Sequence, residues 1–458
     1  MIRYWDTSAL VKVFHRREPG HERASNLLYT KPGLGYFVPN PQDRIEEVLA
    51  PDARTVVIRW RSLYPDAGSL RWEHFDPLPR HLLGPLAETT DPDIVRTHAY
   101  WTHEYVGAGP FALVKWEPGA FLETAAFDGH ALGRPRVDRL TVRIIPDDNT
   151  MLANVLTGNV DVSLDNSLRY EHAVVLKREW GPTNQGVVVF EPIQPRTANF
   201  QRRPDLVNPR ALLDLRVRRA LAHAVDKQGI IDGLFEGEQI PLADQLLPPS
   251  VPYFAELDRT VVKYPLDLRR TEQYMVDAGF RRGNDGIYAD ASERMSFTLI
   301  SGGGTQNEKE RAVLADGWRR AGLEVAEAIL PPSLSPDPEY RATWPSVHTS
   351  AAPLGEAAIS RWTSAQIGSP SNRWRGQNAA AWSNPEYDRL YDAFNSTLDR
   401  AERDRQVVQM MRVLTEDAGA LFFFHNPSVI AHTGALSGPQ VGAPDHLLAW
   451  NVHEWQLR

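Results

Sequence analysis

The 458-residue sequence predicts an α/β protein with two α/β regions. Three observations predict this class. Hydrophobic residues make up 42% of the chain, which is enough to build sizeable cores. Residues 36 to about 195 contain short β-branched runs between turn signals, and from residue 214 amphipathic helical patterns alternate with apolar runs of strand length. No apolar run approaches the roughly 20 residues that span a bilayer, so we expect no transmembrane helix.

The first region begins after a short head. Residues 1–30 predict a strand, a capped turn and the start of a helix, and the Pro- and Gly-rich residues 31–35 interrupt this pattern. The following residues predict short strands at Thr55–Trp60 and Leu140–Ile145, each next to a Pro-Asp turn signal. We therefore expect an α+β texture up to about residue 195.

The second region alternates helices and strands. Asp214–Phe235 is apolar with helical spacing and predicts one amphipathic helix, or two short ones with Asp226 as the cap between them. Further on, the periodicity predicts four helices and three strands. The helices are Pro265–Ala278, Asn307–Ala321, Pro385–Leu398 and Arg400–Asp417, and the strands are Met295–Ser301, Leu323–Leu330 and Ala420–Phe424.

Residues 331–381 are rich in Pro, Ser, Gly, Trp and Arg and have little periodicity. So long a connection favours a binding loop, and Trp with Arg suits a pocket that stacks on a ligand and pairs with carboxylates. Between Arg341 and Ser383 there is no aspartate and the only acid is Glu356, which favours an anionic or neutral ligand group. The alternative, that the tryptophans cap a core, stays open. The candidate ligand-binding residues are Arg361, Trp362, Arg373, Trp374, Arg375, Asn378 and Trp382.

Composition excludes several other classes. The net charge of −8 disfavours binding of a nucleic acid through its phosphates, and the absence of cysteine excludes disulfides, thiolate nucleophiles and cysteine-based metal sites. No sequence signature of a hydrolase, zinc protease, nucleotide-binding loop or calcium loop is present, so we expect no catalytic residues, metal or cofactor. Asp6 and Lys12 interrupt the apolar core that a signal peptide needs, so no signal peptide is predicted.

From about residue 36 to the end, the chain resembles family 5 of the extracellular solute-binding proteins of ABC importers, the dipeptide, oligopeptide and nickel cluster. The resemblance rests on motifs that follow one another in the family's order. They include Ala50-Pro51-Asp52 with Thr55–Ile58, Phe75–His81, Gly107–Gly119, Gly133–Asn149, Leu156–Asp161, Val217–Lys227, Tyr264–Asp267, Ala278–Phe280, Trp382–Asp388 and Trp450–Trp455.

This resemblance implies a two-lobed periplasmic-binding-protein-like clamp of the class II type. Its first lobe would lack N-terminal segments that family members carry. Residues 36–212 and part of 420–458 would form the first lobe and hinge, and 213–419 largely the second lobe. By the same resemblance, the protein would be a monomer outside the cytoplasm that captures a peptide-like solute for a membrane permease.

Residues 1–28 instead resemble the start of PIN-domain ribonucleases, through Asp6–Lys12 and Glu18–Glu22. That resemblance makes Asp6 the first carboxylate of a magnesium site, although such hydrolysis needs three or four converging acids. The alternatives are therefore a PIN-type, magnesium-dependent endoribonuclease with an appended domain, or a non-functional product of fusion or truncation near residues 30–35.

Overall fold

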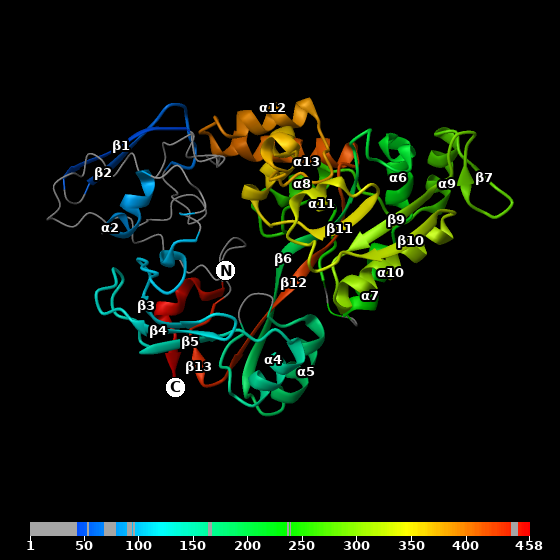
Figure 1. Ribbon diagram of the computed structural model, residues 1–458. Helices are drawn as coiled ribbons and strands as arrows, with labels where there is room; N and C mark the ends of the chain where they lie inside the picture. Colours follow the sequence, from blue (N-terminus) through cyan, green and yellow to red (C-terminus); the bar gives the residue numbers. More distant parts are fainter. Residues whose placement is uncertain are drawn as a thin grey trace. The chain divides into compact units, whose positions relative to one another are not determined.

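The computed structural model describes residues 44–458, except 53–54, 68–78, 89–93, 95–96, 164–166, 236–237, 239 and 441–447. The chain forms two compact units, whose elements Figure 1 labels. The first comprises the described residues up to Phe190 with Asn395–Leu398 and Val429–Arg458, and the second comprises Glu191–Phe394 and Asp399–Ser428. The units thus change at residue 190, earlier than the expected boundary after residue 212. The strand, turn and helix expected in residues 1–30 lie outside the described residues.

The first unit is built mainly from antiparallel strands. β1 and β2 form a hairpin, β4 pairs with β3 on one side and β5 on the other, and β13 pairs with β14. Two helices, α4 and α5, follow this sheet in the chain. The strands are β1 Ile45–Asp52, β2 Thr55–Trp60, β3 Phe111–Glu117, β4 Phe121–Ala126, β5 Arg139–Arg143, β13 Leu436–Ser437 and β14 Gln456–Leu457. The helices are α2 Arg80–Leu83, η5 Gly84–Glu88, η6 Ala99–Trp101, α4 Asp148–Leu156, α5 Tyr170–Trp180 and η11 Leu448–Glu454.

The second unit is built on a five-stranded sheet in the order β10-β9-β11-β6-β12. β9 pairs in parallel with β10 and with β11, whereas β11 and β6 are antiparallel. Its helices are η7 Arg210–Leu213, α6 Leu215–His223, α7 Lys227–Phe235, α8 Phe254–Thr260, α9 Leu268–Asp277, α10 Thr305–Arg320, α11 Pro338–Thr343, η8 Glu356–Trp362, η9 Ser364–Gln366, η10 Pro370–Asn372, α12 Pro385–Phe394 and α13 Arg400–Glu416. Its strands are β6 Gly186–Phe200, β7 Arg281–Arg282, β8 Tyr288–Ala289, β9 Ser296–Ser301, β10 Glu324–Ile329, β11 Val347–Ala351 and β12 Leu421–Thr433, of which β6 and β12 continue into the first unit.

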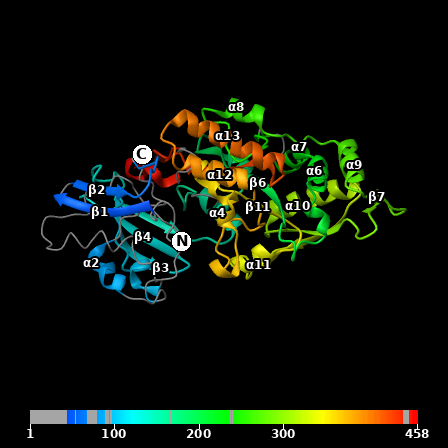
Figure 2. The same cartoon turned by 90° about the horizontal axis from the view of Figure 1, so that it is seen from above.

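Each unit has its own hydrophobic core. In the first, Leu176 and Trp180 of α5 pack with Val155 of α4 and with Ala431 at the far end of β12. In the second, α12 and α13 lie side by side in both views (Figure 1, Figure 2), and the apolar face of α13 packs on the tryptophans of the preceding loops. Burial of these faces is what holds the short helices of both units in place.

Most of the expected elements are present. The hairpin strand Thr55–Trp60 is β2 with the expected bounds, and the apolar stretch after Asp214 is two helices, α6 and α7. Asp226 lies at their junction and accepts a hydrogen bond from the backbone N–H of Gly229 at 2.8 Å, as a helix cap does. None of the helices among the described residues is long and apolar enough to cross a membrane.

The strands of the large sheet extend beyond what the sequence predicts. Residues 331–381, expected to be a binding loop with little periodicity, also contain α11 and the strand β11 in the middle of the sheet. The strand expected at Ala420–Phe424 continues to Thr433, and β6 has 15 residues that no periodicity had indicated. Both long strands run through two units, so different parts of each are buried by different partners. Neither strand therefore shows a single alternation of apolar and polar residues along its whole length.

Candidate functional site

A small pocket in the second unit collects residues from distant parts of the chain. Its cavity volume is about 10 Å³, which is about the space that one water molecule needs. β6, β11, η8 and the turn before α12 each supply part of its wall. The lining residues are Asn199, His348, Arg361, Trp362, Gln377, Asn378, Ala379, Ala380, Trp382 and Gly419. Four of the seven candidate residues are among them: Arg361, Trp362, Asn378 and Trp382.

Arg361 supplies the positive charge of this pocket. It is partly buried in η8, and burial, reinforced by the charge of Arg341, lowers the pKa of Arg361 to about 10. It remains protonated at neutral pH. Its guanidinium lies 5.8 Å from the ring of Trp362 and donates a long, 3.5 Å hydrogen bond to the carbonyl oxygen of Ala351. No carboxylate in the part of the chain that the structure describes forms an ion pair with Arg361.

His348 of β11 lines the same pocket. Burial, followed by the positive charges of Arg361 and Arg341, lowers the pKa of His348 to about 4. Its imidazole is therefore neutral at pH 7, with one nitrogen that donates and one that accepts. The pocket thus combines a guanidinium, a neutral imidazole and the amides of Asn199 and Gln377, with no acid among its lining residues.

Part of the pocket wall is formed by Trp362, Asn378 and Trp382. Trp362 and Trp382 are 3% and 1% exposed and belong to the core, so the alternative role expected for the tryptophans holds for these two. The amide of Asn378 donates to the carbonyl oxygens of Trp382 at 2.7 Å and Thr363 at 3.2 Å, and its oxygen accepts from the backbone N–H of Trp382. The indole N–H of Trp382 donates to Asp417 at 2.6 Å. These bonds fix the turn against the core.

The other three candidates do not line the pocket. Arg373 and Trp374 both have left-handed backbone conformations, with φ of 54° and 60°, immediately after the short helix η10. This bend leaves Arg373 and Arg375 exposed and Trp374 half-buried, with the guanidinium of Arg203 5.6 Å from its ring. The structure therefore separates the seven residues into a pocket group and a surface group.

Sequence reasoning missed His348, Asn199 and Gln377. The first two lie on β11 and β6, the strands that no sequence pattern indicated. The short run Val347-His348-Thr349 is β-branched on both sides of the histidine, and this was the available signal for a strand. Glu356, the only acid of the loop, accepts hydrogen bonds from the hydroxyl of Tyr253 at 2.7 Å and from Arg400, so other side chains of the unit already engage it.

Among the described residues, no group of three His, Asp or Glu side chains is placed to hold an ion. Asp6, the candidate magnesium ligand, lies outside the described residues.

Comparison with known proteins identifies relatives over most of the chain. The family model of bacterial extracellular solute-binding proteins, family 5 Middle, matches residues 15–367. The chain is 24% identical over 384 residues to the oligopeptide-binding protein AppA of Bacillus subtilis, a match that covers 83% of this chain. It spans 66% of the length of that relative and 56% of the length of protein XP55 of Streptomyces lividans.

Solved structures show the same fold. NikZ from Campylobacter jejuni, in complex with Ni(L-His), superposes with a TM-score of 0.76 at 20% identity, covering 93% of this chain and 81% of NikZ. An oligopeptide-binding protein from Thermus thermophilus, complexed with a pentapeptide, gives 0.73 at 21% identity, covering 93% of this chain and 79% of the other. These likenesses confirm the α/β, two-lobed fold class.

The family match bears on the head of the chain too. It begins at residue 15, within the segment 1–28 that resembles a PIN domain, and the Bacillus subtilis relative is named an oligopeptide-binding protein. The PIN interpretation is therefore unsupported. Because the family model covers well over half of the sequence, this chain belongs to the bacterial extracellular solute-binding proteins of family 5.

Proposed function

We propose that this chain is the substrate-binding component of a peptide-type ABC importer. In this role it captures an oligopeptide or a related small solute outside the cytoplasm and passes it to a membrane permease. The observation that carries the proposal is the family match over residues 15–367, supported by relatives named for the oligopeptides that they bind. The net charge of −8 agrees with a partner other than nucleic acid, and the protein acts as a monomer.

The pocket favours a carboxylate as the ligand group that it receives. A guanidinium without an ion pair offers several N–H donors in a fixed plane, which suits a carboxylate, and partial burial strengthens the attraction. His348 adds a neutral donor beside Arg361, so two different groups face the same space.

A cationic amine has no comparable partner in this loop. The pocket has no acidic lining residue, and Glu356 is already bound by Tyr253 and Arg400. Desolvating an ammonium group without a compensating charge is unfavourable. The surface group, Arg373, Trp374 and Arg375, would contact the parts of a longer ligand that extend beyond the pocket. Trp362, Asn378 and Trp382 would shape the pocket wall.

Titration calorimetry with a matched peptide panel tests this proposal. Each of a set of di- to pentapeptides is used in four forms, with a free or acetylated N-terminus and a free or amidated C-terminus. We expect amidation to weaken binding more than acetylation does. A strong preference for the free amine would overturn the carboxylate assignment, and failure of every peptide form to bind would contradict a peptide-like ligand. Native mass spectrometry of the purified chain identifies any solute that it retains.

A further inference from the structure

Two strands of the large sheet carry the chain from one unit to the other, in addition to the short segment Asn395–Leu398 between α12 and α13, which belongs to the first unit. The boundary between the units falls at Phe190–Glu191 within β6 and at Ser428–Val429 within β12. Any bending between the units must therefore change the backbone of both strands. The helix α10 contacts both of them on the second-unit side of these boundaries, through polar side chains of its first turns.

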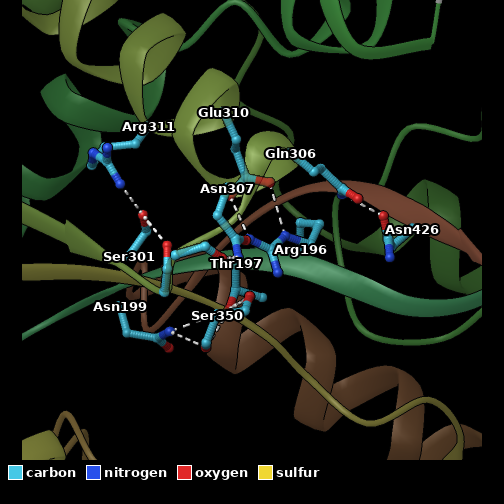
Figure 3. Close-up of polar contacts among 12 residues, drawn as sticks. Arg196, Thr197, Asn199, Ser301, Gln306, Asn307, Glu310, Arg311, Ser350 and Asn426 are labelled. Carbon is cyan, nitrogen blue, oxygen red and sulfur yellow. Dashed lines mark hydrogen bonds and ion pairs between the residues drawn. The ribbon is translucent and has the colours of Figure 1, made fainter. Parts of the chain in front are cut away.

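The contact with β6 is a buried ion pair. The guanidinium of Arg196 donates to both carboxylate oxygens of Glu310, at 2.8 and 3.0 Å, and to the amide oxygen of Asn307 at 2.6 Å (Figure 3). The side chain of Glu310 is fully buried and that of Arg196 is 10% exposed. Two parallel hydrogen bonds fix the distance and the orientation of the strand relative to the helix.

The contact with β12 comes from the same part of the helix. The amide of Gln306 donates to the side-chain oxygen of Asn426 at 2.6 Å, and Figure 3 shows both residues close to the Arg196 cluster. Gln306 and Glu310 are four residues apart, so they lie on the same side of α10 one turn from each other. One helix end thus holds a residue of each crossover strand.

Prolines lie between these contacts and the unit boundaries. In β6 they are Pro192 and Pro195, before Arg196, and in β12 Pro427 follows Asn426 directly. A proline has no backbone N–H to donate, so each weakens the pairing of its strand locally. The regular pairing of β6 with β11 runs from Phe200 to Arg196, so α10 holds β6 where this pairing ends.

We propose that α10 locks the second-unit ends of both crossover strands into one rigid body, so that bending of these two strands is confined to Glu191–Pro195 and Pro427–Ser428. Glu310 is the positioning residue for β6 and Gln306 the one for β12. Loss of these contacts lets the strands flex over a longer stretch, and the range of separations between the units widens. The proposal does not depend on the identity of the ligand, because it concerns the ligand-free chain.

Spin labels on the full chain test this directly. The sequence has no cysteine, so Arg178→Cys on α5 and Glu272→Cys on α9 give one exposed label in each unit. The distribution of distances between the labels is measured by pulsed electron paramagnetic resonance without ligand. We expect Glu310→Gln to broaden this distribution. Adding Arg196→Met to Glu310→Gln should broaden it little further, because both substitutions remove the same contact.

Asp417→Asn is the matched control. Asp417 forms an ion pair with the buried Arg218 at 2.9 Å in the same unit, and neither residue belongs to a crossover strand. This variant should lose stability without broadening the distribution. If Glu310→Gln is folded and leaves the distribution unchanged, or if Asp417→Asn broadens it equally, the proposal is wrong. If Glu310→Gln fails to fold, the distance distribution is measured for the milder variants Gln306→Ala and Asn307→Ala instead. An unchanged width of that distribution would then overturn the proposal.

Discussion

The two ionisable side chains of the pocket owe their lowered pKa values to burial and to neighbouring positive charge. Arg361 and His348 both have a lowered pKa, because each loses water and faces positive charge without an acid nearby. Arg361 nevertheless stays charged at neutral pH, whereas His348 does not. A bound anion would offset the positive charge of Arg361. Two measurable properties therefore depend on these side chains: the affinity for an anionic ligand group, and the stability of the protein in acid.

Arg361→Met should reduce the affinity for peptides with a free carboxylate by about 10- to 100-fold, because hydrogen bonds to a charged group contribute roughly 1.5–3 kcal/mol. The methionine retains much of the apolar stem and removes the charge. Arg373→Met is the control, since Arg373 is exposed and does not line the pocket. Titration calorimetry with one peptide measures both variants. An equal loss in the two variants would show that general surface charge, and not the pocket, attracts the ligand.

Acid should destabilise the second unit through two buried histidines. Burial lowers the pKa of His425 to about 4. Burial, together with the positive charges of Arg361 and Arg341, also lowers the pKa of His348 to about 4. In the unfolded chain, histidine binds a proton near pH 6.5. Stability is therefore complete above pH 6.5 and falls as the pH drops towards 4, by about 1.4 kcal/mol per pH unit for each histidine.

Urea unfolding between pH 4 and 7.5 measures this slope. His425→Gln should flatten it, because glutamine does not bind a proton. His103→Gln, at an exposed position, should leave it unchanged. If His425→Gln keeps the full slope, the neutral state of His425 in the folded protein is contradicted.

At the element scale, short polar contacts decide where helices end. α6 and α7 are separated at Asp226, whose carboxylate accepts the N–H of Gly229, so the chain changes direction between two amphipathic helices. The cap was predictable from sequence because its partner lies three residues away. β11 was not, because its neighbours in the sheet, β9 and β6, are distant in the sequence.

Asp226→Ala should lower the free energy of unfolding by about 1 kcal/mol, the usual cost of losing a helix cap. Asp232→Ala, on the exposed side of the same helix α7, removes a carboxylate without removing the cap and should change stability by less than half as much. Urea unfolding followed by circular dichroism compares the two. Equal effects would mean that helix charge, and not the hydrogen bond to Gly229, is what Asp226 supplies.

At the scale of the whole molecule, the two units have separate cores. Leu414 is fully buried in the core of the second unit and Leu176 in that of the first. A leucine-to-alanine change at such a site removes about 2–5 kcal/mol of stability. Because the units share the strands β6 and β12 but not these cores, damage to one core should remain largely local.

Hydrogen exchange resolved by peptide checks this locality. Leu414→Ala should speed exchange in α12 and α13 more than in α4 and α5, and Leu176→Ala should do the reverse. The two variants serve as controls for each other, since the substitution is the same. Uniform acceleration across both units in either variant would show that the chain unfolds as one cooperative body.

The sequence by itself determined the fold class, the helices α6, α7, α9, α10, α12 and α13 of the second unit, and the family. Helical periodicity, turns and caps depend on residues a few positions apart, so Asp226 and the helices after it were recognisable locally. It also indicated the loop that supplies Arg361. The ordered motifs from residue 36 onward indicated the family that the match over residues 15–367 confirms.

Only the tertiary structure decided which residues meet. The sheet order β10-β9-β11-β6-β12 is not the chain order, so Asn199, His348 and Arg361 reach one pocket from separate segments. The same order brings Arg196 to Glu310, 114 residues further along the chain. Local composition cannot distinguish a tryptophan that packs in the core, such as Trp382, from one at the surface, such as Trp374. Burial depends on packing partners that are distant in sequence, and these also determine which arginine loses its water and which remains solvated.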